Sequence, residues 1–175
     1  MLLLIPCTHA QKYFTREGKI TFNSEAPLER IEAVNNSVTS IIDLESGQLE
    51  FAVLIKAFQF EKALMQEHFN ENYMESSKYP KATFRGAIQD FDRSALTAEG
   101  EHPVSVAGDM TIHGVTKAVS AEGRLIVRGE TIEAFSTFEL NVPEYDIKIP
   151  GLMSEKIAET VTLEVNLEYE PYTAN

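Results

Sequence analysis

Apolar and polar residues alternate along most of this chain from about residue 18 onward. The clearest run is residues 48–57, in which every second residue is apolar: Leu49, Phe51, Val53, Ile55 and Ala57. A period of two residues is typical of a β-strand with one buried face and one solvated face. We therefore expect these side chains to point inward and the chain to form an antiparallel sheet.

Seven further segments show the same alternation. Two are strong, residues 104–112 and 161–169, and five are weaker: residues 19–23, 37–44, 82–88, 120–127 and 132–142. Short turn signals separate many of them: Glu45-Ser46-Gly47, Glu99-Gly100-Glu101, His113-Gly114 and Arg128-Gly129-Glu130. About eight strands joined in this way leave no bare edge if they close into a barrel, which is then filled by side chains or holds one small ligand. The sequence predicts an all-β fold, an antiparallel β-barrel of about eight strands.

Two segments depart from this alternation. Residues 60–74 carry apolar side chains at helical spacing, among them Leu64, Met65 and Phe69, and Pro80 follows shortly after. This pattern predicts a short helix that crosses one end of the barrel as a lid. Residues 143–156 contain two prolines, which are incompatible with a regular central strand, and are predicted to form a second flap.

The first ten residues resemble the end of a signal peptide. Residues 2–5 are apolar, Pro6 ends the run, and Thr8 and Ala10 place small residues before a cleavage site that precedes Gln11. Residues 1–10 are therefore interpreted as a signal-peptide remnant, residues 11–175 as one domain, and the protein as periplasmic or secreted. Cys7 is the single cysteine, so the mature chain would contain no thiol and no disulfide.

Composition restricts the partners of the chain. A net charge of -12 repels polyanions, so no nucleic-acid partner is expected. The four histidines are scattered and lack metal-site spacing, so neither a metal nor another cofactor is expected. Phosphate-binding and nucleophile-elbow motifs are also missing from the sequence, and the chain is predicted not to be an enzyme.

Two motifs link the chain to a known family. The segment Gly108-Asp109-Met110-Thr111-Ile112-His113-Gly114-Val115-Thr116-Lys117 resembles the hallmark hairpin of the YceI-like family. Lys78-Tyr79-Pro80-Lys81-Ala82-Thr83-Phe84, preceded by Glu67-His68-Phe69, resembles a second family segment in the same order. The resemblance covers about residues 18–170 and implies a lipocalin-like barrel around an apolar cavity that binds polyisoprenoid or quinone-type lipids.

The expected ligand contacts are the apolar side chains on the inward faces of the strands and on the two flaps. They are Phe51, Val53, Phe58, Phe60, Met65, Phe69, Tyr73, Phe84, Met110, Phe138, Tyr145 and Leu152. Ligand sites commonly form at barrel mouths and are mostly apolar with few polar anchors, which agrees with this composition. A phosphate-bearing head group would need a cation, for which the candidates are Lys56, Lys62, Arg85 and Lys148, whereas a quinone would need only hydrogen-bond donors.

Two other functions remain open at this stage. The barrel could be an envelope stress-response or structural protein whose core is filled, which predicts no cavity. It could also use a cavity for hydrolysis or isomerisation with His68 or His113 as the base. The hairpin reading of His113 is favoured because His113-Gly114 suits a tight turn. A homodimer is also compatible with the sequence.

Overall fold

The computed structural model describes residues 12–172, so the predicted signal-peptide remnant at residues 1–10 lies outside the described residues. Strands account for most of the chain. They are β1 (Lys12–Glu25), β2 (Arg30–Asp43), β3 (Gln48–Leu54), β4 (Gln59–Phe60), β5 (Lys81–Ile88), β6 (Gly100–Ile112), β7 (Val115–Arg128), β8 (Thr131–Asn141) and β9 (Thr160–Pro171).

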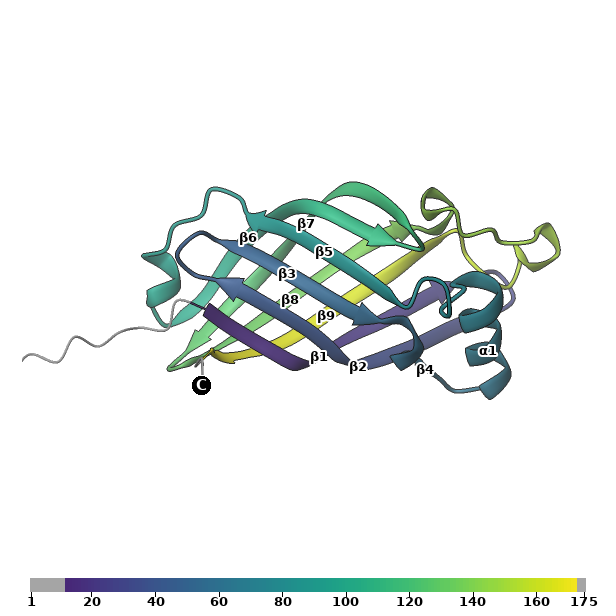
Figure 1. The fold of residues 1–175 in the computed structure, drawn as a ribbon, viewed down its shortest axis with the longest axis horizontal. Helices are drawn as coiled ribbons and strands as arrows, with labels where there is room; N and C mark the ends of the chain where they lie inside the picture. The colour runs from purple at the N-terminus through teal and green to yellow at the C-terminus, as the bar shows by residue number, and fades with distance from the viewer. Residues whose placement is uncertain (1–11, 173–175) are drawn as a thin grey trace, which may run out of the picture.

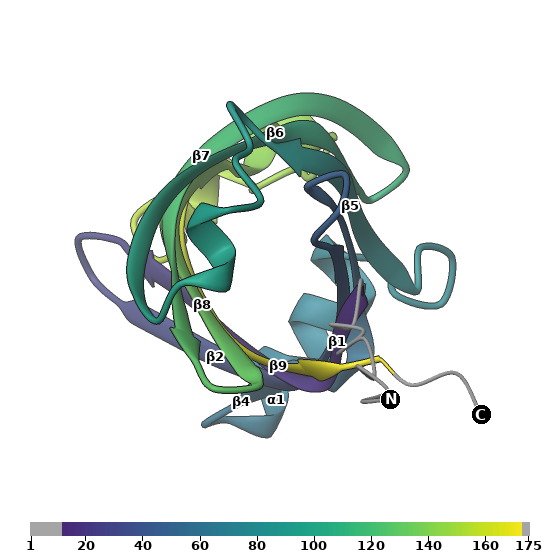
Figure 2. The same ribbon diagram turned by 90° about the vertical axis from the view of Figure 1, so that its left-hand side faces the viewer.

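The sheet closes on itself. Its strand order is β1-β9-β8-β7-β6-β5-β3-β2, and β1 also pairs with β2, so eight antiparallel strands form a complete ring (Figures 1 and 2). The two-residue strand β4 pairs with Ala33 and Val34 of β2 outside this ring order. Closure pairs edges that would otherwise be exposed to other chains. The predicted antiparallel barrel of eight strands is confirmed.

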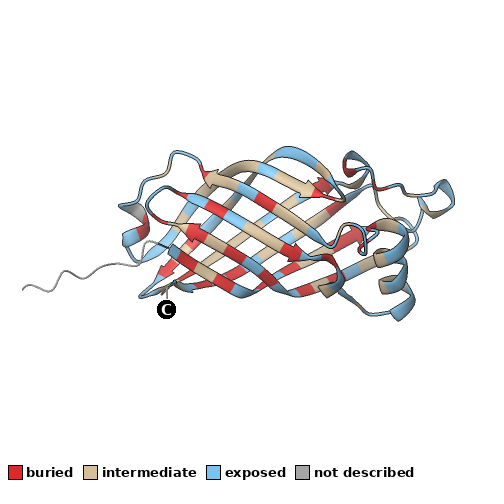
Figure 3. Cartoon of the chain, viewed as in Figure 1, coloured by how far each residue is buried: buried red, intermediate tan, exposed pale blue. Residues whose placement is uncertain are grey.

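Burial follows the predicted alternation along the strands, as the banding in Figure 3 shows. On β3, Leu49 and Val53 are buried whereas Leu54 is 46% exposed, so the inward face is the one that the sequence indicates. Two hydrophobic clusters result. One fills most of the barrel interior, and the other, around Ile112, Tyr145 and Val161, lies at the end that carries the β6–β7 hairpin.

Element boundaries differ from the predictions in three places. β3 ends at Leu54, and Ile55–Ala57 continue as the 3₁₀ turn η1. The predicted turn at residues 99–101 is wrong, because β6 already begins at Gly100 and a longer connection containing the 3₁₀ turn η3 (Ala95–Thr97) precedes it. Pro103 is tolerated within β6 because the β5–β6 ladder extends only over Val106–Thr111 of β6, leaving Pro103 beyond it.

The helical segment and the flap lie at the end of the barrel opposite the first residues of β1, whereas the connection with η3 lies at the other end (Figure 1). The predicted lid consists of α1 (Ala63–His68) followed by a π-helical turn, η2 (Phe69–Tyr73). The predicted flap contains two short 3₁₀ turns, η4 (Val142–Tyr145) and η5 (Gly151–Met153). The Leu28 amide donates a hydrogen bond to the Glu155 carbonyl, and the Ala158 amide donates one to the Ser24 hydroxyl. These bonds attach the flap to the end of β1 and to the β1–β2 turn.

Candidate functional site

The barrel encloses a cavity of about 310 Å³. Its wall is built almost entirely from apolar side chains on the inward faces of the strands, with further residues from α1 and the flap. The volume lies at the lower end of the range of about 300–1,000 Å³ seen for small-molecule pockets. The barrel interior is therefore not completely filled by its own side chains.

Ten of the twelve predicted contact residues belong to the cavity lining. These are Phe51, Val53, Phe58, Phe60, Met65, Phe69, Tyr73, Phe84, Met110 and Phe138. They come from strands, from α1 and η2, and from the residue that follows η1, and the closure of the barrel brings them around one space. Their contact with a ligand stays a prediction.

The other two predicted residues, Tyr145 and Leu152, lie elsewhere. Tyr145 is 2% exposed and packs in the second hydrophobic cluster beside Ile112 and Val161. Leu152 is 96% exposed, because η5 turns its side chain to solvent. The sequence could not place either residue, since an irregular segment has no periodicity from which to read an inward face.

Several lining residues were not among the predicted contacts. Leu163, Val165 and Leu167 of β9 line the cavity. Their alternation with polar residues indicates an inward face, so the sequence pattern could have placed them among the predicted contacts. Ile149 and Ile157 of the flap also line it, but nothing in their local sequence pattern distinguishes them from exposed flap residues.

An aromatic cluster holds the lid against the barrel. The Phe69 ring lies 4.9 Å from the ring of Phe60, 5.7 Å from that of Phe58 and 6.2 Å from that of Phe22, measured between centroids. Phe69 therefore connects the helical segment to β4, to the residue after η1 and to β1. Tilted and edge-on ring pairs at these separations stabilise packing beyond the area that they bury.

Polar groups are sparse within the cavity, and the deepest one is already satisfied. The Tyr169 hydroxyl lies 2.7 Å from Ser40 Oγ, and Ser40 donates to the Glu50 carbonyl at 2.9 Å, so Tyr169 is the donor to Ser40. Burial raises the pKa of Tyr169 above its ordinary value, and burial likewise raises the pKa of Tyr73. Both phenols stay neutral near pH 7, and the interior presents no charge of theirs to a ligand.

The ionisable residues Glu29, His68 and Lys156 belong to the cavity lining at the end covered by α1 and the flap. Arg124 also belongs to the lining, from the outer face of β7. None of these four residues lies on the inner face of a strand.

None of the four predicted cationic anchors belongs to the lining formed by residues 12–172: Lys56, Lys62, Arg85 and Lys148. Lys62 pairs at 3.3 Å with Glu29, which belongs to the lining at the end covered by α1, and Arg85 pairs with the exposed Glu50 at 3.6 Å. Their positions do not support a role as a head-group anchor inside the barrel.

His113 joins the two sequence motifs. It occupies the β6–β7 turn with φ 51°, followed by Gly114 with φ 77°, which is the left-handed geometry of a tight hairpin. Its Nε2 lies 2.8 Å from Glu75 Oε2, and its Nδ1 lies 3.2 Å from the Tyr145 carbonyl oxygen. Each ring nitrogen of His113 thus lies within hydrogen-bonding distance of one oxygen acceptor.

The Tyr79 ring packs against the His113 ring. Its centroid lies 4.5 Å from the His113 ring, and a Cβ atom placed on Gly114 would come within 2.7 Å of Tyr79 Cε1. Gly114 is therefore required both for its positive φ and for the close approach of Tyr79. Because both ring nitrogens of His113 are occupied and His113 does not belong to the cavity lining, its position favours the structural reading over the catalytic one.

Two further properties of the described residues concern metal binding and membrane-spanning helices. Within residues 12–172, no group of three His, Cys, Asp or Glu side chains is placed to hold a metal ion. Over the same part of the chain, every helix is too short or too polar to cross a bilayer.

Fold and cavity together define the class: an eight-stranded antiparallel β-barrel with an apolar interior cavity and a helical lid. The model of the YceI-like domain matches residues 9–169. The chain therefore belongs to the YceI-like family, as the two motifs indicated.

Solved structures of this fold resemble the barrel closely. A polyisoprenoid binding domain from Saccharophagus degradans superposes with a TM-score of 0.80 at 15% identity, covering 93% of this chain and 99% of that chain. BcnA of Burkholderia cenocepacia has a TM-score of 0.73 at 16% identity, with 86% and 95% covered. At these identities the likeness shows a shared fold.

Curated relatives are closer in sequence but match a shorter segment. A UPF0312 protein of Pseudomonas putida (strain W619) is 32% identical over 103 residues, which is 55% of this chain and 48% of that protein. A UPF0312 protein of Vibrio parahaemolyticus is 27% identical over 89 residues, 47% of this chain and 43% of that protein. The matched segment thus spans about half the length of these relatives.

Proposed function

We propose that this protein binds an apolar lipid of the polyisoprenoid or quinone type inside the barrel. The observation that carries the proposal is the continuous apolar cavity of about 310 Å³ beneath the α1 lid. Removing apolar surface from water contributes roughly 25 cal/mol per Å², so an alkyl or prenyl chain gains several kcal/mol in such a cavity without directional contacts. Affinity would then depend on the apolar chain more than on the head group.

Relatives support the chemical class of the ligand. The structural neighbour from Saccharophagus degradans is described as a polyisoprenoid binding domain, and this chain shares its fold over 93% of its length. The ten predicted contact residues in the lining are all aromatic or aliphatic, which suits a hydrocarbon ligand better than a polar one.

We propose no catalytic role for the cavity. His113 does not belong to the cavity lining, and both of its ring nitrogens have hydrogen-bond partners. His68 belongs to the lining only at the end covered by α1 and the flap. A filled structural barrel is disfavoured by the cavity itself. Export remains a proposal that rests on the apolar residues 2–5 and on the small residues Thr8 and Ala10.

Native mass spectrometry of the protein purified from its own organism tests the binding proposal. We expect a bound lipid that denaturation releases, and we expect added prenol to raise the unfolding free energy by about 2.7 kcal/mol at a ligand concentration near 100 times Kd. An apo mass together with no stabilisation by prenols or quinones would refute the proposal.

A matched pair of variants tests the location. Val53 lines the cavity and is 8% exposed, whereas the next residue, Leu54, points outward and is 46% exposed. Val53→Asp is expected to abolish prenol binding, and Leu54→Asp is expected to leave it unchanged, since only the first places a carboxylate in the apolar space. Val53→Thr, which adds a hydroxyl at nearly constant volume, gives a weaker loss if the aspartate variant fails to fold.

A further inference from the structure

The barrel wall is incomplete between β7 and β8. Their ladder pairs only Gly123–Arg128 of β7 with Thr131–Ser136 of β8. The remaining residues of β7 pair with β6, and those of β8 pair with β9, but residues 115–122 and 137–141 lie beyond the β7–β8 ladder. In Figure 1, β7 arches over the top of the barrel toward the β6–β7 hairpin.

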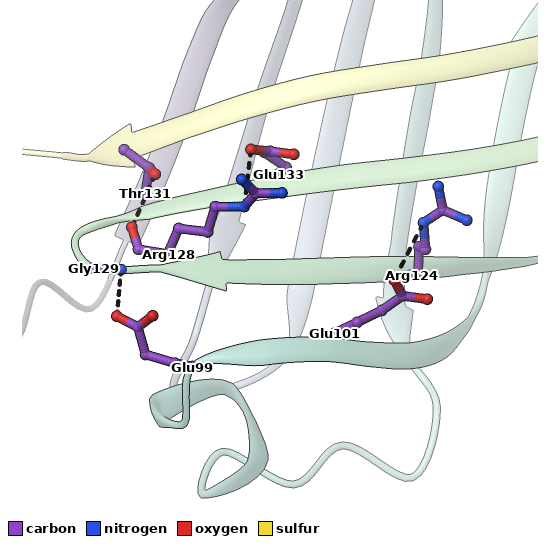
Figure 4. Close-up of polar contacts among 7 residues, drawn as sticks. All are labelled: Glu99, Glu101, Arg124, Arg128, Gly129, Thr131 and Glu133. Atoms are coloured by element: carbon purple, nitrogen blue, oxygen red, sulfur yellow. Dashed lines mark hydrogen bonds and ion pairs between the residues drawn. The ribbon is translucent and has the colours of Figure 1, made fainter.

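The paired half of the two strands is firmly closed. The Ser136 hydroxyl donates to the Glu122 carbonyl at 2.6 Å, and a Cβ atom on Gly123 would lie 2.6 Å from the Phe135 carbonyl oxygen. The β7–β8 turn is also fastened, because the Gly129 amide donates to Glu99 and Arg128 pairs with Glu133 at 3.4 Å (Figure 4). The separation of β7 from β8 therefore starts sharply at Gly123.

The flap closes the far end of the separation. Tyr145, 2% exposed, and Leu140, 9% exposed, pack in the second hydrophobic cluster with Val115, and the His113 side chain contacts the Tyr145 carbonyl. What remains, beyond the hydrogen bond between Ser136 and Glu122, is an opening bordered by residues 119–121 of β7 and 137–138 of β8, which we call the lateral window.

The cavity reaches this window. Its lining includes the inward residues Val119, Ala121 and Phe138, and also Ser120, Arg124 and Phe135 from the outward faces of the same two strands. Successive residues of a strand point to opposite faces of the sheet, so where β7 and β8 are not paired, at Ser120, a space that contacts both faces passes between the strands. Arg124 and Phe135 are paired in the ladder and form the outer rim beside this gap. The lateral window thus connects the cavity to the outer surface.

We propose that the lateral window is a second opening of the ligand cavity, through which the end of a long apolar chain leaves the barrel. This inference rests on the proposed function. A cavity of about 310 Å³ accommodates a short prenyl chain, whereas a long one must extend beyond it. The inner border of the window, Val119, Ala121 and Phe138, is apolar and continuous with the cavity wall, which suits a hydrocarbon.

A β-strand from a second molecule fits the window less well. The part of β8 beyond the ladder is only residues 137–141, and Leu140 within it is already covered by the flap cluster. An added strand of the usual length of about five to six residues could pair with all of residues 137–141 only by displacing the flap from Leu140. A second copy of the chain is therefore treated as an outcome of the test.

The test uses single-cysteine variants of the full chain in which Cys7, the native cysteine, is replaced by serine. Ala121→Cys places a thiol at the window, Ala118→Cys places one on the exposed outer face of the same strand, and Ala82→Cys places one on the cavity wall formed by β5. Each variant is alkylated with N-ethylmaleimide, its fold is checked by circular dichroism, and its affinity is measured for farnesol, a short prenol, and solanesol, a long one.

The adduct at Ala121→Cys is expected to weaken solanesol binding by at least about tenfold, equivalent to about 1.4 kcal/mol, while farnesol binding changes by less than about twofold. The adduct at Ala82→Cys is expected to weaken both prenols, and the adduct at Ala118→Cys neither. Solanesol, but not farnesol, is also expected to slow the alkylation of Ala121→Cys.

Three results would overturn the lateral window as an exit. Equal loss of both prenols on modification at residue 121 would make this position ordinary cavity wall, and unchanged binding of both would show that no chain passes there. A lipid-free dimer that dissociates on this modification would assign the window to a second copy. If the unmodified protein binds neither prenol, the proposed function itself fails and the window proposal fails with it, a result distinct from the other three.

Discussion

Replacing His113 by alanine is expected to destabilise the fold by about 3 kcal/mol. The hydrogen bond to the Glu75 carboxylate, 2.8 Å long, is of the charged kind that contributes about 1.5–3 kcal/mol, and the 46% exposure of the Glu75 side chain places it at the low end. The bond to the Tyr145 carbonyl adds about 1 kcal/mol, and packing on the Tyr79 ring adds about 0.5 kcal/mol. For a protein of this size, each kcal/mol lowers Tm by about 2–4 °C.

The assay is urea unfolding followed by far-ultraviolet circular dichroism, with Tm measured in parallel. His113→Asn separates the turn from the side-chain contacts, because asparagine adopts a positive φ readily but cannot reach both Glu75 and Tyr145. Glu75→Gln keeps an acceptor and removes the charge, so it is expected to cost less than His113→Ala. Glu71→Gln, an exposed change in the preceding turn η2, is the control and is expected to alter stability by less than about 0.5 kcal/mol.

A double-mutant cycle between His113 and Glu75 isolates their interaction, which is expected to be about 1.5 kcal/mol. If His113→Ala costs less than about 0.5 kcal/mol, the two motifs are not joined in the way their geometry indicates. If it leaves stability intact but abolishes a chemical activity of the protein, the structural reading of this residue is wrong.

Three further predictions concern the barrel interior. Because burial raises the pKa of Tyr169, the phenol of the unfolded state loses its proton first as pH rises. The unfolding free energy is therefore expected to fall above about pH 10, by up to about 1.4 kcal/mol per pH unit from this group. Tyr169→Phe is expected to flatten this pH dependence, measured by urea titration at alkaline pH. Gly108→Ala would drive a methyl group into the Arg85 carbonyl and is expected to cost about 1–3 kcal/mol by thermal unfolding. An equal or larger loss for Gly151→Ala, whose Cβ meets nothing within 4 Å, would contradict the close contact between β5 and β6. Phe69→Ala is expected to lower the unfolding free energy by about 2 kcal/mol, because it removes the ring that holds the lid. The same variant is expected to release prenol faster in stopped-flow measurements. An unchanged release rate would show that the lid does not control access to the cavity.

The strands and the inward faces of the barrel could be predicted from the sequence because both depend on local order along the chain. A period of two fixes which side chains share a face, and a slip of one residue would turn every apolar side chain outward. For this reason Val53 and Phe84 could be placed in the interior before the barrel was known. The lid helix was predictable on the same ground, from a change of period.

The positions of Tyr145, Leu152 and the flap isoleucines could not be predicted in this way. These residues lie in a segment whose course is set by contacts with distant parts of the chain, such as the hydrogen bonding between Leu28 and Glu155. Nor could the surroundings of the four predicted cationic anchors be predicted, since a long lysine or arginine side chain can reach either solvent or a neighbouring carboxylate.

The sequence by itself determined the strand pattern, the helix, the hairpin at His113 and the family, because each depends on residues close together in the chain. Only the tertiary structure decided that the two family motifs contact each other, that the interior holds a cavity, and that β7 separates from β8 at Gly123. These features depend on the distances between strands that are far apart in the sequence, and on how completely their inward side chains fill the barrel. Such distances arise from closure of the whole ring and have no local signature in the sequence.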